Sequence, residues 1–166
     1  MNIFYLDEDV MKISRMLCDK HSVKMVLESA QMMSTAHRTL DGDEYANRVG
    51  LYQTVHKNHP STIWTRTTSG NYAWHFALFS AMLDEYQFRY EKLHKCKVLL
   101  TLLEQQPQNI PRGDFSPPPQ CMPDKYKSDN TVRAYRNFYL GEQARFASWK
   151  NRAVPDWFSK AGKSDI

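Results

Sequence analysis

The chain has 166 residues, of which 42% are hydrophobic and 13% aromatic, and its formal net charge at pH 7 is +4. This length suits one domain that buries roughly two-thirds of its unfolded surface, and the mild positive charge permits an anionic partner without requiring one. No run of 18 apolar residues occurs, and no basic region followed by an apolar stretch opens the chain, which argues against a transmembrane helix and a secretory signal. We therefore expect a single domain over residues 1–166 of a cytoplasmic protein that has no membrane partner.

Four main helices are predicted by the spacing of apolar side chains, and they make the expected fold all-α. The first covers residues 8–17 after Asp7, a residue type that caps helices well, and the second covers 19–40. In the third, over 70–104, aromatic and leucine side chains recur every three or four residues, the pattern of one buried helical face. The fourth covers 129–152. The side chains expected to be buried in this aromatic core are Phe76, Phe79, Leu83, Tyr86, Tyr135 and Trp149.

A proline-rich stretch interrupts the helical pattern at about residues 107–124. Six of the eight prolines lie between Pro107 and Pro123, and this density excludes a continuous helix or a central strand. Too few residues follow for a second independent core. We therefore expect an ordered loop that crosses a single domain, and a short extended segment over residues 2–5.

The three cysteines are the candidates for disulfides, and the cysteines and six histidines are the candidates for metal ligands. Cys18, Cys96 and Cys121 form neither a CxxC pair nor a disulfide framework. The histidines form no HExxH motif, and glycine-rich phosphate loops are missing from the sequence. We expect reduced thiols, no bound metal and no cofactor.

A polar stripe follows the second helix at steps of three and four residues, so its members lie on one face. These residues are His21, Lys24, Glu28, Gln31, Thr35 and Arg38. A solvated helix face would also be polar. The mixture of His, Gln and Thr around one carboxylate is equally consistent with a binding or catalytic site, and both interpretations stay open.

The segment between the second and third helices is rich in hydrogen-bond donors. It contains His56, His59, Arg66 and Asn71 and ends at a helix N-terminus, where backbone amides and an arginine can hold a phosphate. We predict that His59 and Arg66 share a cavity with His21, Lys24 and Glu28. On the fourth helix, Arg136 and Arg145 lie among aromatic residues, which suits phosphate contacts combined with base stacking but also a helix whose cationic edge is in water.

Several of these segments resemble phage-type pyrimidine-dimer DNA glycosylases, the endonuclease V type. Residues 17–21 have the order Leu-Cys-Asp-Lys-His, and Glu28 follows the histidine after seven residues. Residues 83–90 resemble the central helix of that family, and 153–158 resemble its terminal Pro-x-Trp-Tyr segment. The chain is also similar to a group of small phage proteins of undefined activity that share a DKHxxKMxLExxQ segment. The resemblance implies a small all-helical enzyme that extrudes a base, with Glu28 beside the scissile sugar.

The sequence departs from this family at the residues that carry its lyase chemistry. The family's nucleophile is the α-amine of a small residue exposed after Met removal, whereas residue 2 here is Asn2, whose bulk disfavours that removal. The arginine before the family's glutamate is Leu27 here, and the third position after the glutamate is Gln31. We therefore expect no strand-nicking lyase activity, even if a base is released.

Three functions remain from the sequence. The first is a DNA-acting enzyme that handles an extruded pyrimidine, either by glycosylase-like hydrolysis or by base modification, with Glu28 and His21 as catalytic residues. The second is a module that binds a nucleotide or nucleic acid without chemistry. The third is a phage factor that binds a host protein. The first two predict a phosphate-bearing partner in the host cytoplasm, and none of the three predicts an oligomeric state.

Overall fold

The computed structural model describes residues 1–164, and all regular secondary structure within them is helical. The α-helices in this range are α1 (Val10–Met16), α2 (Asp19–Asp41), α3 (Asp43–Val49), α4 (Pro60–Thr67), α5 (Ser69–Tyr90), α6 (Leu100–Glu104), α7 (Thr131–Phe138) and α8 (Asp156–Ser164). Short 3₁₀ segments are η1 (Lys95–Leu99), η2 (Asp124–Tyr126) and η4 (Ala144–Phe146), and η3 (Tyr139–Gln143) is π-helical. The predicted all-α fold is confirmed, although the division into four main helices is not.

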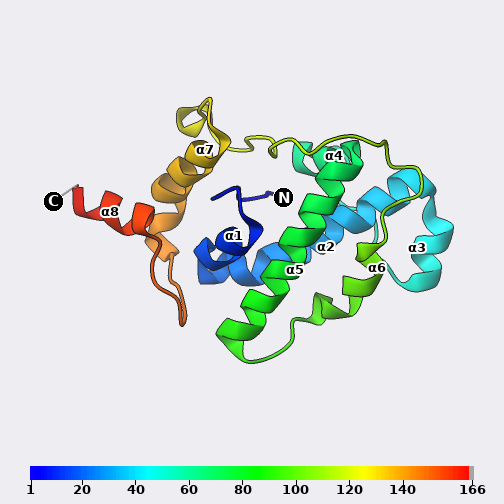
Figure 1. Cartoon of the computed structure of the whole chain (residues 1–166), viewed down its shortest axis with the longest axis horizontal. Coiled ribbons are helices and arrows are strands. Elements are labelled where there is room, and N and C mark those ends of the chain that lie inside the picture. Colours follow the sequence, from blue (N-terminus) through cyan, green and yellow to red (C-terminus); the bar gives the residue numbers. More distant parts are fainter. Residues whose placement is uncertain (165–166) are drawn as a thin grey trace.

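The two long helices, α2 and α5, cross at the centre of the molecule, with α1 and α4 packed against them (Figure 1). Each buries one apolar face in a common core, which includes Met32 and Met33 from α2 and Phe79 and Met82 from α5. The N-terminal residues 3–6 are buried in the same core without joining a helix. The start of the chain is therefore held in the middle of the structure, beside α2.

The predicted third helix is shorter than its apolar pattern suggested. Helix α5 ends at Tyr90 because Glu91 adopts a left-handed conformation with φ 55°, which closes the helix through a bond from its N–H to the Gln87 carbonyl. After this turn, η1 and α6 follow as separate short elements. Leu93, which continues the apolar pattern, is exposed, whereas Leu99 and Leu103 are buried from these separate elements. Apolar spacing alone did not show where the helix stops.

The predicted fourth helix was likewise wrong beyond its first turns. Only α7 is α-helical, and η3 and η4 lead into an irregular segment before α8. Trp149 lies in that segment, half-buried, and its indole N–H donates to the Met16 carbonyl at 2.8 Å. Phe76 is also only half-buried, whereas Phe79, Leu83, Tyr86 and Tyr135 are buried as expected.

Two short helices that apolar spacing missed are explained by backbone chemistry. Gly42, at φ 84°, separates α2 from α3, and Pro60 opens α4 at a position where its missing N–H costs nothing. The cap of α1 differs by two residues from the one expected, since Asp9 rather than Asp7 caps this helix. Thr68 caps α5 through its side chain.

The proline-rich segment crosses the molecule from α6 past α4 to α7 (Figure 1). Its backbone is bonded to the first turn of α5, with Gly70 N–H donating to the Gly113 carbonyl at 2.9 Å. A Cβ on Gly70 would lie 2.5 Å from the Phe115 nitrogen, so only glycine allows the loop to approach this closely. The segment is thus an ordered part of the domain, and its far end reaches the N-terminus of the chain.

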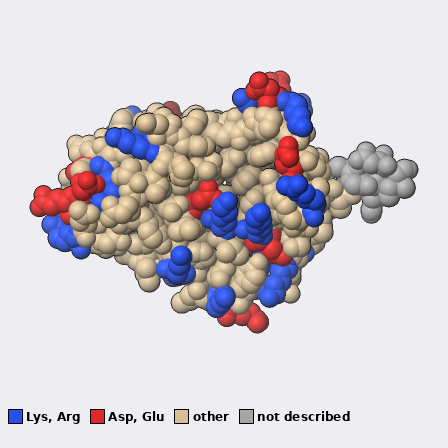
Figure 2. Space-filling model, turned by 180° about the vertical axis from the view of Figure 1, so that it is seen from behind, with Lys and Arg blue, Asp and Glu red and all other residues tan. Residues whose placement is uncertain are grey.

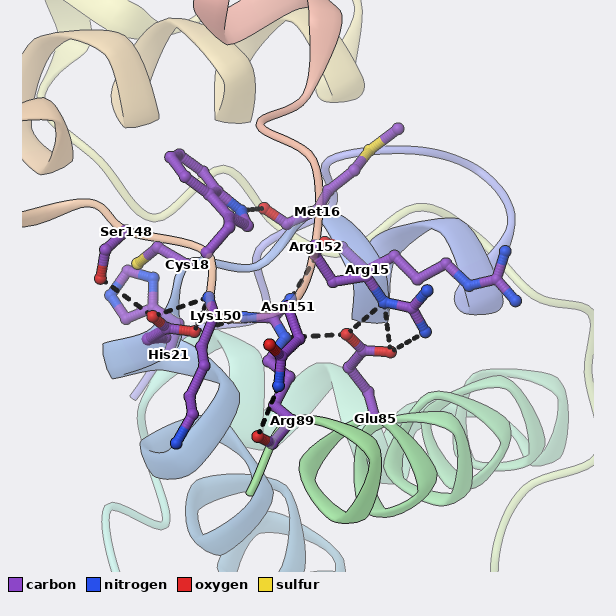
Figure 3. Close-up of polar contacts among 12 residues, drawn as sticks. Arg15, Met16, Cys18, His21, Glu85, Arg89, Ser148, Lys150, Asn151 and Arg152 are labelled. Carbon is purple, nitrogen blue, oxygen red and sulfur yellow. Dashed lines mark hydrogen bonds and ion pairs between the residues drawn. The ribbon is translucent and has the colours of Figure 1, made fainter. Parts of the chain in front are cut away.

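A buried ionic network fastens the segment after η4 to the helical core (Figure 3). Arg89 is fully buried and bonds Glu85 at 2.8 Å and Asp19 at 3.0 Å. Arg152 bonds Glu85 at 2.9 Å from the other side, and the Lys150 backbone N–H donates to Asp19. The network fixes the first residue of α2, and with it the position of the polar residues in the next turns.

Within residues 1–164, no helix is long and apolar enough to span a membrane. The three cysteines are unpaired in the structure, with Cys18 and Cys96 buried and Cys121 partly exposed.

Candidate functional site

A cavity of about 510 Å³ lies where the N-terminus, the first half of α2 and residues 138–146 meet. Its wall contains His21, Lys24, Glu28 and Arg145, four of the residues singled out from the sequence. A cavity of similar size, about 520 Å³, lies near Asp7 and Arg136. Only the first has a buried carboxylate with an unused oxygen in its wall, so the chemistry favours it as the functional site.

Glu28 carries the feature that distinguishes this cavity. The residue is 8% exposed, and its Oε1 lies 3.2 Å from the α-amine of Met1. Its Oε2 is buried and has no hydrogen-bond partner among the described residues. A buried polar atom without a partner is rare and costs roughly 1–3 kcal/mol or more. A ligand or a water that donates a hydrogen bond to this oxygen would recover that energy.

The amine reaches Glu28 because Asn2 anchors the N-terminal segment. The Asn2 side chain donates to the Cys121 carbonyl at 3.0 Å and accepts from the Tyr135 hydroxyl at 2.9 Å. From the sequence, Asn2 was important only as an obstacle to Met1 removal. The structure gives it a second role, since it ties the start of the chain to the proline-rich segment and to α7.

His21 forms a rigid polar part of the same wall. Its ring stacks on Phe4 with centroids 4.2 Å apart and an interplanar angle of 16°, and its Nδ1 lies 2.6 Å from the Tyr139 hydroxyl. That hydroxyl also accepts from the Cys18 N–H at 3.1 Å. Burial, assisted by the charges of Lys20 and Lys24, lowers the pKa of His21 to about 4. At neutral pH the imidazole is therefore uncharged and acts as a hydrogen-bonding group.

Three cationic side chains border the opening. Lys20, Lys24 and Arg145 are exposed, and none belongs to an ion pair in the described part of the chain. The Lys20 ammonium lies 4.4 Å from the centroid of the Phe146 ring, so cation and aromatic face adjoin. The face shown in Figure 2 carries basic and acidic side chains interspersed, without one continuous basic patch. Lys20, Lys24 and Arg145 would attract an anion to the rim of this cavity.

The cavity predicted to unite His21, Lys24 and Glu28 with His59 and Arg66 contains only the first three. His59 caps α4, since its Nδ1 accepts from the Ser61 N–H at 3.1 Å. Burial lowers the pKa of His59, the charges of the Met1 amine and His56 lower it further, and the charge of Glu28 raises it. Arg66 is turned toward its own loop and donates to the Lys57 carbonyl at 2.9 Å.

Other residues predicted to bind phosphate use their polar atoms inside the protein. Arg38 donates to the carbonyls of Leu51 and Tyr52 and closes the loop after α3. Asn71 is buried, donating to the Trp64 carbonyl and accepting from the Ser116 N–H. The polar atoms of Arg38 and Asn71 are therefore engaged in hydrogen bonds that hold loops.

Arg136, Gln31 and His56 lie outside the cavity wall. Arg136 donates to the Leu6 carbonyl at 2.8 Å and pairs with Asp7 at 3.4 Å. Gln31 is half-buried on α2, and His56 is exposed in a turn with φ 46°. The stripe on α2 thus supplies the site with only its first three members. Of the later ones, Thr35 bonds the backbone of Val55 and Arg38 bonds residues of α3 and of the loop after it.

The sequence suggested an N-terminal amine only through the family's nucleophile at residue 2, and it did not predict that the Met1 amine, Phe4 and Tyr139 belong to this site. No local pattern connects residues 1, 28 and 139, which meet only through tertiary contacts. The only sequence feature that indicated this contact was the aromatic segment of Phe4 and Tyr5, which precedes the helix with the polar stripe.

No three His, Cys, Asp or Glu side chains in the described residues are grouped to hold a metal ion. Comparison with protein-family models, curated proteins and solved structures finds no match for this chain.

Proposed function

We propose that this protein is a DNA-acting enzyme that receives an extruded pyrimidine nucleotide in the Glu28 cavity. The observation that carries the proposal is the buried Glu28 carboxylate, which keeps one oxygen without a partner at the wall of a cavity rimmed by three cations. An unused buried carboxylate oxygen is costly for stability alone, and a buried polar group without a partner in a folded protein often has a functional role. The resemblance of residues 17–28 to phage-type pyrimidine-dimer glycosylases points in the same direction.

The surroundings of Glu28 suit a base taken out of the stack. Phe146 is half-buried at the cavity wall and can pack against a base, and Lys20, Lys24 and Arg145 can contact the flanking phosphates. Because the pKa of His21 is low, the neutral imidazole can hydrogen-bond a base without adding charge.

The chemistry assigned to Glu28 is that of a general base or an electrostatic stabiliser. In glycosidic hydrolysis, the bond between C1′ and the base nitrogen breaks, a water oxygen bonds C1′, and the base leaves with a proton. The Glu28 carboxylate accepts the water's proton or stabilises the positive charge that develops on the sugar. Base modification at the same position would use the carboxylate to remove a proton from the base.

The test separates binding from turnover. We expect single- and double-stranded oligonucleotides to bind at low salt, as measured by fluorescence anisotropy, and released or altered bases to be detected by mass spectrometry. Glu28→Gln should keep the fold and the affinity and lower the rate on the order of 10²–10⁴-fold. Glu44→Gln, an exposed glutamate on α3, is the matched control.

Two results would overturn the enzyme proposal in different ways. If the protein binds DNA, Glu28→Gln binds more tightly and neither form turns over, the chain is a sequestering module. If it binds DNA no better than a neutral control protein, a free nucleotide or a host protein becomes the better partner.

A further inference from the structure

The Tyr139 hydroxyl lies between one hydrogen-bond donor and two candidate acceptors. The backbone N–H of Cys18 can only donate, and its nitrogen lies 3.1 Å from the hydroxyl oxygen. The candidate acceptors are His21 Nδ1 at 2.6 Å and the Cys18 sulfur at 3.5 Å. Burial raises the pKa of Tyr139 well above its ordinary value. The hydroxyl therefore keeps its single proton at neutral pH and gives it to one of the two acceptors.

These contacts decide which ring nitrogen of His21 carries a proton. A ring nitrogen accepts a hydrogen bond much better than a thiol sulfur does, and here the nitrogen is also the closer of the two. The Tyr139 hydroxyl therefore donates to His21 Nδ1. The pKa of His21 is lowered to about 4, chiefly by burial, so the ring has one proton at neutral pH. Because Nδ1 accepts, that proton is on Nε2.

The Nε2 atom of His21 is available to a ligand. It forms no hydrogen bond with the residues that the structure describes, and unlike Glu28 Oε2 it is not fully buried. His21 is 5% exposed and belongs to the wall of the Glu28 cavity. Its stacking on Phe4 fixes the plane of the ring. The cavity wall thus contains a neutral N–H donor with a fixed orientation.

We propose that His21 Nε2–H donates a hydrogen bond to the O2 atom of the departing pyrimidine, an inference that rests on the glycosidic hydrolysis proposed above. When the bond between C1′ and N1 breaks, both electrons stay on the base, and the negative charge is shared between N1 and O2. The water oxygen bonds C1′, and the Glu28 carboxylate takes the water's proton and returns it to solvent. The base acquires a proton from solvent as it leaves, and His21 keeps its own.

An uncharged imidazole suits this role. A fixed N–H donor stabilises negative charge that develops on an oxygen without transferring a proton, and neutral imidazoles act in this way beside reacting carbonyl groups. Cytosine and thymine both carry O2 and differ at C4. The contact with His21 therefore assists the release of either pyrimidine and does not choose between them. Tyr139 is the positioning residue, because its hydroxyl sets the tautomer of the ring.

The tautomer can be measured without turnover. The ¹⁵N spectrum of the full chain at pH 7 should show the His21 ring protonated at Nε2. Tyr139→Phe should raise the population protonated at Nδ1. Tyr72→Phe removes another buried hydroxyl that contacts a histidine, 3.0 Å from His37 Nε2. It is the matched control and should leave the His21 signals unchanged. A wild-type His21 ring protonated at Nδ1 would overturn the proposal.

The role of the donor is tested by turnover of oligonucleotides that carry one thymine or one cytosine, with the released base measured by mass spectrometry. His21→Phe keeps a ring against Phe4 but removes the donor, and it should lower kcat on the order of 10²–10³-fold with little change in KM. His21→Gln places an amide N–H near the position of Nε2 and should recover part of the lost rate. Tyr72→Phe should react at the wild-type rate.

The contact with O2 is tested by changing the substrate. Sulfur is a weak acceptor, so 2-thiothymine and 2-thiocytosine weaken a hydrogen bond at this position. The 2-thio base should lose about tenfold more rate relative to its parent in the wild type than in His21→Phe, the worth of one hydrogen bond. Comparing the two ratios removes any effect of sulfur on the leaving group itself.

Failure of this inference can be told apart from failure of the proposed function. If the wild-type protein releases no pyrimidine from any of these oligonucleotides, the proposed hydrolysis is wrong, and the role of His21 with it. If the wild type releases a base but His21→Phe is equally fast, only the role of His21 is overturned. The same holds if the 2-thio substitution costs both proteins the same factor.

Discussion

Glu28 on α2 and Glu85 on α5 are both buried glutamates, with 8% and 4% of their surface exposed, yet their surroundings differ. Both oxygens of Glu85 are bonded by guanidinium groups, from Arg89 on one side and Arg152 on the other (Figure 3). Glu28 has the Met1 amine at one oxygen and, within the part of the chain that the structure describes, no hydrogen-bond partner at the other. Burial of a charge therefore does not by itself indicate a site; the unused hydrogen-bonding capacity of the buried group does.

The two glutamates also have complementary tasks. The Glu85 network is internal and holds the start of α2 against the segment after η4, through Arg89 and Asp19. Glu28 lies two and a half turns further along α2, at the wall of a cavity. The Glu85 network positions α2, the helix that carries Glu28. We therefore expect variants of the Glu85 network to lower stability most, and variants of Glu28 to affect the chemistry most.

The largest expected effect on stability comes from breaking the Glu85 network. Arg89→Met removes one partner from a buried ionic cluster and should cost about 3–5 kcal/mol of unfolding free energy. Glu28→Gln should cost only about 1 kcal/mol, because the amide oxygen still accepts from the Met1 amine and the unpartnered anionic oxygen disappears. Urea unfolding of both variants measures the difference. If both variants lose the same unfolding free energy, Glu28 contributes as much to stability as the Glu85 network does.

Acid should destabilise the fold through the buried histidines. The pKa of His21 is lowered to about 4 and that of His75 to about 3, chiefly by burial. As the pH falls below about 6.5, the unfolded chain binds protons that the folded chain does not, so stability declines until the pH reaches the folded pKa.

For His21 alone this decline amounts to about 3 kcal/mol between pH 6.5 and 4. His21→Gln should flatten the stability curve in that window, and the exposed His56→Gln should leave it unchanged. Urea unfolding at several pH values measures the slope. A slope unaffected by His21→Gln would mean that His21 is already protonated in the folded protein.

Tyr139→Phe should have a smaller effect on stability and a specific effect on the cavity. It removes the hydroxyl that contacts His21 Nδ1 and accepts from the Cys18 N–H, and should cost about 1–3 kcal/mol. We expect the ¹⁵N signals of the His21 ring to change tautomer population while DNA affinity stays within twofold. Unchanged ring signals would show that the hydroxyl does not orient His21.

The smallest expected effect concerns the cavity rim. Lys24→Ala should lower the slope of log affinity against log salt by about 0.9 for duplex DNA or about 0.7 for a single strand, since one phosphate contact is lost. Unfolding free energy should change by less than about 0.5 kcal/mol, as for other exposed positions. Lys92→Ala, exposed beyond the end of α5, should leave the slope unchanged. Equal slopes for both variants would indicate diffuse attraction instead of a local contact.

The sequence by itself determined much of α2 and its polar face. The predicted helix over 19–40 agrees with the observed Asp19–Asp41, and the spacing of His21, Lys24 and Glu28 correctly placed them on one face, because a helix of 3.6 residues per turn brings such positions together. The all-α class followed from the same periodicity. These features are local, so they depend only on residues within a few turns.

Tertiary structure decided where helices stop and what each polar residue does. The left-handed turn at Glu91 and the π-helical segment at Tyr139 left no signal in the apolar spacing. Arg38 and Glu28 belong to one polar stripe, yet their side chains differ in what they bond. The Arg38 guanidinium donates to backbone carbonyls of a loop, whereas one oxygen of Glu28 has no hydrogen-bond partner among the described residues. The reason is that hydrogen-bond satisfaction of a buried group depends on atoms distant in sequence, such as the Met1 amine 27 residues before Glu28.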